Sequence, residues 1–471
     1  MPLIIPSNSI SGEYEVANSL RFDDGSSDYL SRTTSTPTSD KIGTYSFWFK
    51  RSHLGTTQNI FNNYIDASNY AFLRFDGSAD RLEFFSLNGA DDLSLRTARV
   101  FRDTSAWYHI VFRVDMTQST SSNRLKFYVN GVEETSFTST NYGVQNEVPS
   151  LFEASASGNN RIGTDETSSY YIDGYMAEAV YCDGQSLDPT SFGEFDSDTG
   201  IWKPIDVSGL TFGTNGFYLD FENSGSLGAD VSGNGNNFTV NNLTSIDQTT
   251  DTCTNNFCTL NPLDNDSSTT FSEGNCKAVT DSSLRKPFYG TFHLTQGKWY
   301  WEVKMIDIDS NNFITGISGS FCSINDVLGY ELYDYGYRKA SGLRNNDSDT
   351  SYGNTYADGD IVGVYLDLDN NKLYFAKNGT IQNSGTGISI SDPSVTAKGG
   401  YAPAGSDFSV GGGSTVEFNF GNPTFSISSG NSDPEGYGNF EYSPNDGGSA
   451  SFDSSAKDFY ALNSKNLAEY G

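Results

Sequence analysis

Tyrosine, asparagine and aspartate side chains gather in two short stretches, and these residue types suit the binding of sugars. The first stretch comprises Tyr330, Tyr333, Asp334, Tyr335, Tyr337, Arg344, Asn345 and Asn346. The second comprises Tyr170, Tyr171 and Asp173. Aromatic rings stack on the apolar C–H face of a sugar, and amides and carboxylates bond its hydroxyl groups. We expect both stretches to be loops that contact a glycan; the alternative is that the tyrosines pack loops or subunits together.

Two further stretches carry oxygen ligands of the kind that calcium prefers, namely Asp307-x-Asp309-x-Asn311 and Asp367-x-Asp369-Asn370. Neither has the glycine and the distal glutamate of an EF-hand loop. Both lie at expected strand ends, where Asp and Asn commonly form turns. We therefore expect turns and no bound metal or cofactor, with calcium as the alternative.

Catalysis that depends on histidine is not expected, because the chain has only three histidines. His109 lies inside an apolar stretch and is expected to be a partly buried strand residue. His53 is expected in a loop and His293 near a strand end, so no Ser/His/Asp arrangement can be assembled from them.

The overall charge limits the partners of this 471-residue chain, which has 28 Lys+Arg against 59 Asp+Glu and a net charge of −31. Nucleic-acid binding is not expected, because phosphate contacts need basic residues on one face. The acidity is evenly spread, with 15 basic and 32 acidic residues in 1–248 and with 13 basic and 27 acidic residues in 249–471.

No run approaches the roughly 20 apolar residues of a membrane span, and the start lacks a signal peptide. The five cysteines fit no metal pattern and are expected to be free thiols in a reducing cytoplasm.

The elements that must position these side chains are β-strands. Turn residues interrupt the chain every eight to twelve residues, and alternating aromatic or β-branched runs lie between them, which is typical of all-β sandwiches. The runs that predict strands are 45–50, 70–75, 81–87, 107–114, 125–129, 299–306, 313–318, 361–366, 372–376 and 416–420. Asn130-Gly131 and Asn378-Gly379 supply the residues of tight hairpin turns. A short helix is expected near 188–195, capped by Asp188.

The spacing of these runs predicts five regions. Residues 1–13 form an N-terminal anchor peptide, 14–226 a first sandwich, and 227–269 a connector rich in Gly, Asn and Thr with a short strand near 238–240. Residues 270–425 form a second sandwich, and 426–471 a loop followed by a segment that docks back onto a domain. The fold class is thus all-β, with two jelly-roll, concanavalin A-like sandwiches in tandem.

Specific strings resemble two known domain families. Residues 14–225 resemble the LamG-like, concanavalin A-like sandwich through 29–32, 44–50 (TYSFWFK), 107–111 (WYHIV) and 125–131 (LKFYVNG). Residues 270–422 resemble a SPRY domain through 297–303 (GKWYWEV), 316–318, 358–364 (DGDIVGV), Asp367 and 372–379 (KLYFAKNG). The resemblance implies a ligand surface made by loops at one end of the SPRY sandwich, where the Tyr330 stretch is expected.

The concanavalin A-like fold also includes glucanases, and the laminarinase type uses a Glu-x-Asp-x-Glu strand as its catalytic carboxylates. The nearest match here is Glu194-Phe195-Asp196-Ser197-Asp198, which departs at the last position and follows a turn with proline and glycine. A solvated acidic loop is the better interpretation. We therefore expect no catalytic residue and no enzyme activity.

Nearly the whole chain is similar to lectin-like virion proteins of marine tailed phages. The strings that carry this resemblance are 1–6 (MPLIIP), 187–195 (LDPTSFGEF), 254–264 (TNNFCTLNPLD) and 461–467 (ALNSKNL). It implies a virion structural protein on the particle exterior, made in the host cytoplasm, either tail-fibre-like or capsid-associated. Such a protein would recognise a host surface glycan or protein without catalysis. Its partners would be other virion proteins and the host surface, in a homo-oligomer that is a trimer by analogy.

Ile4 and Ile5 are expected to anchor the N-terminal peptide on the particle by adding to a groove or a sheet edge. Two alternatives remain. One is a purely architectural decoration or tail protein without an external ligand. The other, which the absence of a paired-carboxylate strand disfavours, is a polysaccharide depolymerase.

Overall fold

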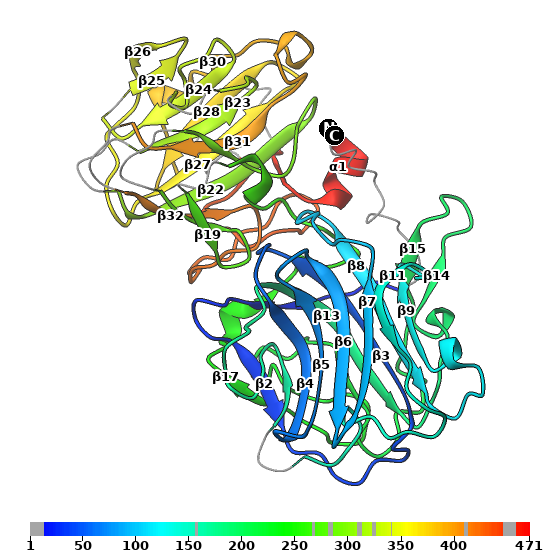
Figure 1. The fold of residues 1–471 in the computed structure, drawn as a ribbon. Helices are drawn as coiled ribbons and strands as arrows, with labels where there is room; N and C mark the ends of the chain where they lie inside the picture. Colours follow the sequence, from blue (N-terminus) through cyan, green and yellow to red (C-terminus); the bar gives the residue numbers. More distant parts are fainter. Residues whose placement is uncertain are drawn as a thin grey trace. The chain divides into compact units, whose positions relative to one another are not determined.

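The computed structural model describes residues 14–155, 159–265, 269–280, 286–308, 313–322, 326–340, 342–408, 413–445 and 458–471. The chain divides into two compact units, one within Ser11–Thr254 and one within Asn255–Gly471, which we call the first and the second sandwich. Strands dominate both units, so the all-β prediction of two tandem sandwiches is confirmed (Figure 1). Among the described residues, no helix has the length and apolar character needed to cross a membrane.

The first sandwich packs two large antiparallel sheets against each other. The sheet that we call sheet A runs in the order β10 (Val132–Glu133), β9 (Leu125–Val129), β8 (Trp107–Asp115), β3 (Ile42–Arg51), β13 (Gly174–Asp183), β1 (Ser19–Phe22) and β18 (Gln248–Thr249), with β16 (Phe217–Leu219) beside β13. Sheet B runs in the order β11 (Phe137–Asn141), β7 (Asp91–Thr97), β6 (Arg81–Asn88), β5 (Asn69–Asp76), β4 (Gln58–Asp66), β12 (Asn160–Ile162), β2 (Tyr29–Arg32) and β17 (Thr239–Asn241). A small hairpin pairs β14 (Gly193–Phe195) with β15 (Trp202–Pro204).

Period-two alternation explains the core of the first sandwich, because successive strand residues point to opposite faces. On β9, Leu125, Phe127 and Val129 all point into the core, as the sequence predicts. On β3, Phe47 and Phe49 do the same from sheet A, and Leu73 and Phe75 face them from β5 of sheet B.

The outward side of sheet A is buried as well. Trp48, Trp107 and Tyr175 lie beneath Trp202 of β15 and Cys253. Farther along, Val111 and Val180 pack against side chains from the segment 187–218. We call this side of sheet A the covered face. Its side chains are therefore unavailable at the surface of the first sandwich.

The second sandwich also has two antiparallel sheets. Sheet G runs in the order β19 (Thr270–Ser272), β20 (Lys277–Val279), β32 (Thr415–Asn419), β22 (Lys298–Asp307), β27 (Ile361–Asp367), β28 (Lys372–Lys377) and β29 (Thr380–Ile381), with β30 (Ile388–Ser389) beside β28. Sheet H runs in the order β21 (Phe288–Tyr289), β31 (Ala402–Ser406), β23 (Ile314–Ser318), β24 (Asp334–Arg338), β25 (Gly342–Asn345) and β26 (Ser348–Ser351). Between the sheets lie Trp299, Trp301, Val364, Phe375 and Phe418, all buried.

The last described segment, residues 458–471, packs onto the second sandwich. Strand β33 (Tyr460–Ala461) pairs in parallel with β22. The helix α1 (Ser464–Tyr470) follows, and the side chain of Asn463 caps it by accepting a hydrogen bond from the Asn466 N–H. The helix was not expected, because its Asn and Lys residues give no apolar period.

Short 3-10 turns connect several strands. They are η1 (Ser121–Asn123), η2 (Pro189–Ser191), η3 (Ser245–Asp247), η4 (Pro262–Asp264), η5 (Asn383–Gly385) and η6 (Pro393–Val395). The helix expected near 188–195 is the single turn η2, and the Asp188 side chain makes no capping bond. Asn130, Gly131, Asn378 and Gly379 all have positive φ, which confirms both predicted hairpin turns. The five cysteines are free thiols.

The stretch 227–269, expected as a connector, is divided between the two units at Thr254 and Asn255. Its strand β17 pairs with β2 and its strand β18 pairs with β1, so this part completes both sheets of the first sandwich. Beyond the division, Phe257, Cys258 and Leu260 are buried in the second sandwich. The polar composition of the stretch reflects turns between short strands.

Candidate functional site

The outward side of sheet B carries a row of aromatic side chains. Along β5 and β6, Ala71, Leu73, Leu82 and Phe84 point into the core, so their neighbours point outward. The outward rings are those of Tyr29, Tyr64, Tyr70, Phe72 and Phe85, and we call the surface that they form the aromatic face. All five are half-buried, and among the described residues none belongs to a hydrophobic core cluster.

The rings at the centre of the aromatic face lie side by side. Phe72 and Phe85 are directly opposite each other on β5 and β6, with ring centroids 5.5 Å apart and planes at 23°. Tyr70 adds a third ring, 6.4 Å from Phe72 and 5.8 Å from Phe85. Cross-strand aromatic pairs of this kind stabilise a sheet. Partly exposed aromatic rings are also the side chains on which a pyranose ring stacks.

Charged side chains border these rings. The Arg74 guanidinium lies 4.0 Å from the centroid of the Phe72 ring, and its Nε donates to Glu83 Oε2 at 2.8 Å. Arg96 on β7 donates to the other oxygen of Glu83, with its terminal nitrogen at 2.6 Å. The Glu83 bond raises the pKa of Arg96. One carboxylate thus orders two guanidinium groups beside the aromatic surface.

Two asparagines on β4 lie beneath this border. Asn62 pairs with Phe72 and Asn59 pairs with Arg74, and a bulge between Asn59 and Phe61 places both asparagines on the outward side. They are 1% and 2% exposed. Within the described residues, Asn62 Nδ2 and Asn59 Oδ1 have no hydrogen-bond partner. A buried amide atom without a partner is costly, so these two asparagines are strained polar groups beneath the aromatic face.

The second predicted stretch lies at the edge of the aromatic face. Tyr171 packs against Tyr29 with centroids 6.3 Å apart, and the Asn59 N–H donates to the Tyr170 carbonyl at 2.9 Å. The Tyr170 side chain is 44% exposed, whereas Asp173 is buried. Tyr170 and Tyr171 are therefore in a loop, as expected, and border a larger aromatic surface.

The first predicted stretch is different, because Tyr335 and Tyr337 lie in strand β24 and not in a loop. The alternation in Asp334–Arg338 turns both rings into the core, where Tyr337 packs against Tyr352, Tyr356 and Phe375. Tyr330, by contrast, is 43% exposed, and Tyr333 is half-buried against the core. The structure therefore leaves Tyr330 at the surface and takes Tyr335 and Tyr337 away from it.

The polar members of that stretch are occupied by structural bonds. Asp334 is buried and accepts hydrogen bonds from the Ser318 hydroxyl and the Cys322 thiol, and burial raises its pKa. Arg344 is 7% exposed, forms ion pairs with Asp347 and Asp349, and lies over the Phe408 ring. Asn345 donates to the carbonyls of Leu332 and Asp334. These bonds hold in place the segment that follows strand β23.

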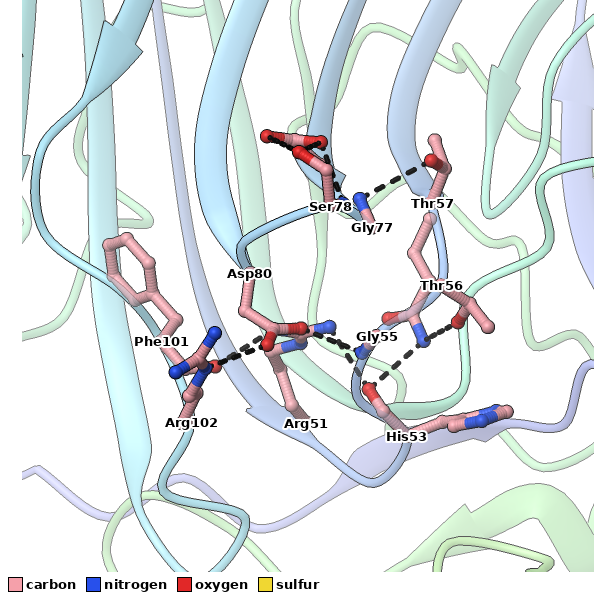
Figure 2. Close-up of polar contacts among 12 residues, drawn as sticks. Arg51, His53, Gly55, Thr56, Thr57, Gly77, Ser78, Asp80, Phe101 and Arg102 are labelled. Carbon is pink, nitrogen blue, oxygen red and sulfur yellow. Dashed lines mark hydrogen bonds and ion pairs between the residues drawn. The ribbon is translucent and has the colours of Figure 1, made fainter. Parts of the chain in front are cut away.

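One rim of the first sandwich brings together Asp24, His53 and Asp173, and one ligand atom from each lies within 4.8 Å of the others. Figure 2 shows how the loop with His53 is held. Asp80 accepts hydrogen bonds from Arg51, Arg102 and the Gly55 N–H, and Arg51 also donates to the His53 carbonyl. Although burial acts to raise it, the pKa of Asp80 is lowered by the Gly55 bond and the two arginines. Asp24, His53 and Asp173 are the residues here that could hold a metal ion.

The predicted oxygen-ligand stretch at 367–370 is a turn at the end of β27, whereas Asp307 of the other stretch is the last residue of strand β22. Asp367 is buried, and its carboxylate accepts from the backbone N–H and side-chain amide of Asn370. Asp309 and Asn311 lie outside the described residues, as do Ile4 and Ile5 of the expected anchor.

The acidic string at 194–198 is exposed and bonded within itself. Glu194 lies in strand β14, not in a loop, and its carboxylate pairs with Lys203. Asp196 pairs with the same lysine and accepts backbone bonds from Asp198 and Thr199 in the following turn. The alternating carboxylates of a glycosidase cleft are not formed by these described residues.

His109 lies in strand β8, as the sequence predicts, but it is almost completely buried, at 1% exposed, where partial burial was expected. Trp202 Nε1 donates to its Nδ1 at 2.9 Å, so its Nε2 carries the proton and bonds the Ser46 hydroxyl at 2.9 Å. Burial lowers the pKa of His109 to about 3, so the ring is neutral near pH 7.

Residue types and spacing alone do not single out the centre of the aromatic face. They predict its strands but not a binding role for Tyr70, Phe72 and Phe85. Alternation supplies the signal: in 70–75 the residues Ala71, Leu73 and Phe75 form one apolar set, so Tyr70 and Phe72 form a second aromatic set on the opposite side. In 84–85 the two adjacent phenylalanines must point to opposite faces.

Two family models match the chain. Residues 24–184 match the concanavalin A-like lectin/glucanases superfamily, and residues 298–423 match the SPRY domain. The LamG-like and SPRY domains expected from the sequence are therefore present.

Known proteins match parts of the chain. The ATP-dependent RNA helicase Ddx1 of Drosophila melanogaster is 30% identical over 171 residues, which are 34% of this chain and 22% of the helicase. Ran-binding protein 9 of Danio rerio is 33% identical over 86 residues, which are 18% of this chain and 14% of that protein. The SPRY domain of human HERC1 is 18% identical with a TM-score of 0.25, covering 30% of this chain and 86% of the domain. The chain thus spans less than a quarter of the length of these two curated relatives.

Proposed function

We propose that this chain, which carries a concanavalin A-like sandwich followed by a SPRY domain, is a non-catalytic binding protein. Its first sandwich would hold a saccharide on the aromatic face. The observation that carries this proposal is the row of half-buried rings formed by Tyr70, Phe72 and Phe85. Rings on a rigid sheet lose little conformational freedom when a sugar stacks on them. The ion pairs of Glu83 hold the bordering guanidinium groups in place for the sugar hydroxyls.

The second sandwich supports contact with a protein. Large apolar side chains are exposed around Lys398, whose ammonium group lies 3.7 Å from Asp264 and 5.7 Å from the Phe321 ring centroid. Phe321 is 73% exposed, Leu263 60% and Val395 58%. Exposed apolar groups that cluster around a charged residue are typical of protein interaction sites. One sandwich would thus bind sugar while the other attaches the chain to a protein partner.

The resemblance to phage proteins supports a proposal for where this binding takes place. In a tail-fibre-like or capsid-associated appendage of a tailed phage, copies of the chain on one particle would bind the host surface together. Each contact could then be weak, because repeated sites give a high effective concentration. Antibody labelling of intact particles by electron microscopy tests the location. Deleting residues 2–12 tests the anchor, which fails as a proposal if occupancy on particles stays at the wild-type level.

Calorimetric titration of the full chain with host surface polysaccharide tests the binding proposal. Phe72→Ala should weaken binding by up to about tenfold, since one aromatic contact is worth on the order of 0.5–1.5 kcal/mol. Tyr330→Ala in the second sandwich is the matched control, because Tyr330 is also an exposed aromatic residue. Loss of binding in Tyr330→Ala alone would move the site to the second sandwich.

The two alternatives give distinct results in the same preparation. A purely architectural protein would bind no polysaccharide and no susceptible cell. A depolymerase would release reducing sugar from the polysaccharide, and Glu194→Gln would abolish that release.

A further inference from the structure

A groove opens at one end of the first sandwich, where three connecting segments meet. They are the segment before β3, the turn between β4 and β5, and the segment between β11 and β12. We call this hollow the end groove. Its volume is about 710 Å³, which is within the range of sites that hold a small ligand or a large side chain.

Buried polar side chains hold the walls of the end groove in place. Asp183 is 1% exposed, and its carboxylate accepts hydrogen bonds from the Thr38 N–H at 2.7 Å and the Ser39 N–H at 3.2 Å. On the opposite wall the fully buried Asn63 donates from Nδ2 to the Glu153 carbonyl at 3.0 Å. Because these bonds fix the backbone on both sides, the groove is formed before a ligand enters, and little ordering is needed on binding.

The polar lining of the end groove consists of hydrogen-bond acceptors. Among the described residues, no lysine, arginine or histidine side chain lines it. The Asp40 carboxylate is paired with Lys41 at 2.9 Å. Glu153 Oε2 accepts from the Ser150 hydroxyl at 3.1 Å, while Oε1 takes part in no hydrogen bond or ion pair within the described part of the chain. Glu153 therefore presents a negative charge to the groove that no cation of the described chain neutralises.

Apolar side chains complete the lining, with Ile65 on one wall and Val148 on another. An arginine side chain has the same dual character, since an apolar stem carries a planar, charged head. Its fork of N–H groups matches a carboxylate, and such charge-assisted bonds are stronger than neutral ones. The net charge of −31 on the chain also favours the approach of a basic partner.

We propose that the end groove holds an arginine side chain from a partner protein. The guanidinium group would bind the Glu153 carboxylate, and the Thr36 hydroxyl would accept a further hydrogen bond. The stem of the arginine would contact Ile65 and Val148. This contact is separate from saccharide binding on the aromatic face and does not depend on it.

Calorimetric titration of the full chain tests the proposal, at an ionic strength of about 0.15 M so that distant charges are screened. The probe is a glycine–serine peptide with one central arginine. Its reference is the same peptide with citrulline, which has the shape of arginine without the charge. The arginine peptide should bind at least about tenfold more tightly, because the citrulline peptide lacks the charge-assisted bonds.

Two variants of the end groove should weaken binding of the arginine peptide. Glu153→Gln should do so by about tenfold, whereas Glu222→Gln removes the same charge at an exposed position outside the groove and should change nothing. Ala154→Trp fills the groove and should abolish binding. Its control is Ala90→Trp, at an exposed position in the turn between β6 and β7. Thermal melting verifies that each variant folds.

Equal binding of the two peptides would overturn the recognition of a charged head. Unchanged binding of the arginine peptide in both Glu153→Gln and Ala154→Trp would place the contact elsewhere on the acidic surface and overturn the site. A neutral glucan oligosaccharide whose binding is lost in Ala154→Trp would make the groove a saccharide site and overturn the arginine assignment. Phe72→Ala should leave peptide binding unchanged, so failure of this inference is distinct from failure of saccharide binding.

Discussion

On β3 of the first sandwich the outward Trp48 is 5% exposed and lies 4.7 Å from the ring of His109, under segments that come from elsewhere in the chain. On β5 the outward Phe72 is half-buried and touches Phe85 and Arg74. Both residues are aromatic, and both occupy outward positions on central strands. The difference between them is whether another part of the first sandwich is packed on top.

The polar groups on the two faces differ in the same way. On the covered face, Lys50 Nζ lies 2.8 Å from Asp251 Oδ2, and both side chains are 1% exposed. Glu178 accepts from the hydroxyls of Tyr14 at 2.9 Å and Tyr218 at 2.7 Å. On the aromatic face, Asn62 Nδ2 has no hydrogen-bond partner among the described residues, and on the covered face Arg113 Nε has none either. The two faces therefore differ in the buried ion pair and in the carboxylate bonds of Glu178, which are found on the covered face.

The largest expected effect comes from removing one partner of the buried ion pair. Asp251→Ala leaves the Lys50 ammonium group buried without its carboxylate, and should lower the free energy of unfolding by about 3–5 kcal/mol. Denaturant unfolding followed by tryptophan fluorescence measures this. Glu133→Ala, which breaks the exposed pair with Lys126, is the control and should cost less than about 1 kcal/mol. Similar losses in the two variants would contradict the contrast between covered and exposed charges.

A somewhat smaller effect is expected for Glu178→Gln, and it should depend on pH. Burial is the main cause that raises the pKa of Glu178 to about 7, above its ordinary value of 4.5. A carboxyl whose folded pKa is raised stabilises the fold fully below pH 4.5, and that stabilisation is lost as the pH rises through 7. The wild type should therefore lose on the order of 3 kcal/mol of unfolding free energy across this range, relative to the glutamine variant.

Unfolding curves at several pH values between 4 and 8 test this prediction. Burial likewise raises the pKa of Glu302 in the second sandwich to about 7, but Glu302 is common to both proteins, so the difference between them isolates Glu178. Parallel pH profiles for the wild type and Glu178→Gln would show that the carboxyl is not buried as described.

The smallest effect on stability is expected on the aromatic face. Phe72→Ala should change the unfolding free energy by about 1 kcal/mol or less, because it removes a surface ring and one cation–π contact. The equivalent change on the covered face, Trp48→Ala, should cost about 3–5 kcal/mol because it leaves a cavity. Thermal melting of both variants makes the comparison, and equal losses would mean that the aromatic face is also part of the folded core.

Local residue patterns predicted much of this fold. The strand 125–129 was predicted with its exact bounds and its inward side chains, because alternation and the Asn130-Gly131 turn act over a few residues. The same alternation explains why Tyr335 and Tyr337 are in the core, although their residue types suggested a binding loop. A strand centred on Gly336 has weak β-propensity, and this obscured the pattern.

The covering of a face could not be predicted in this way. Alternation assigns Trp48 and Phe72 to outward positions, but the residues that bury Trp48 include Trp202 and Cys253, which are far from it in the sequence. Glu178 illustrates the same limit, since its positive φ of 50° and the bulge beside it arise from pairing with β3. The candidate site was therefore found only in part, through Tyr170 and Tyr171 at its edge.

The parallel pairing of β33 with β22 has a consequence for synthesis on the ribosome. Tyr460 and Ala461 complete a ladder with Trp299 and Tyr300, so about 160 residues separate the two halves of this contact. At 5–20 residues per second, the ribosome needs roughly 10–30 s to cover that distance. During this interval the first sandwich can already fold, because all its strands precede Asn255. The Trp299–Tyr300 part of the β22 edge, beyond the residues that pair with β32, stays unpaired until β33 emerges, so this short stretch is the last part of the sheet to be completed.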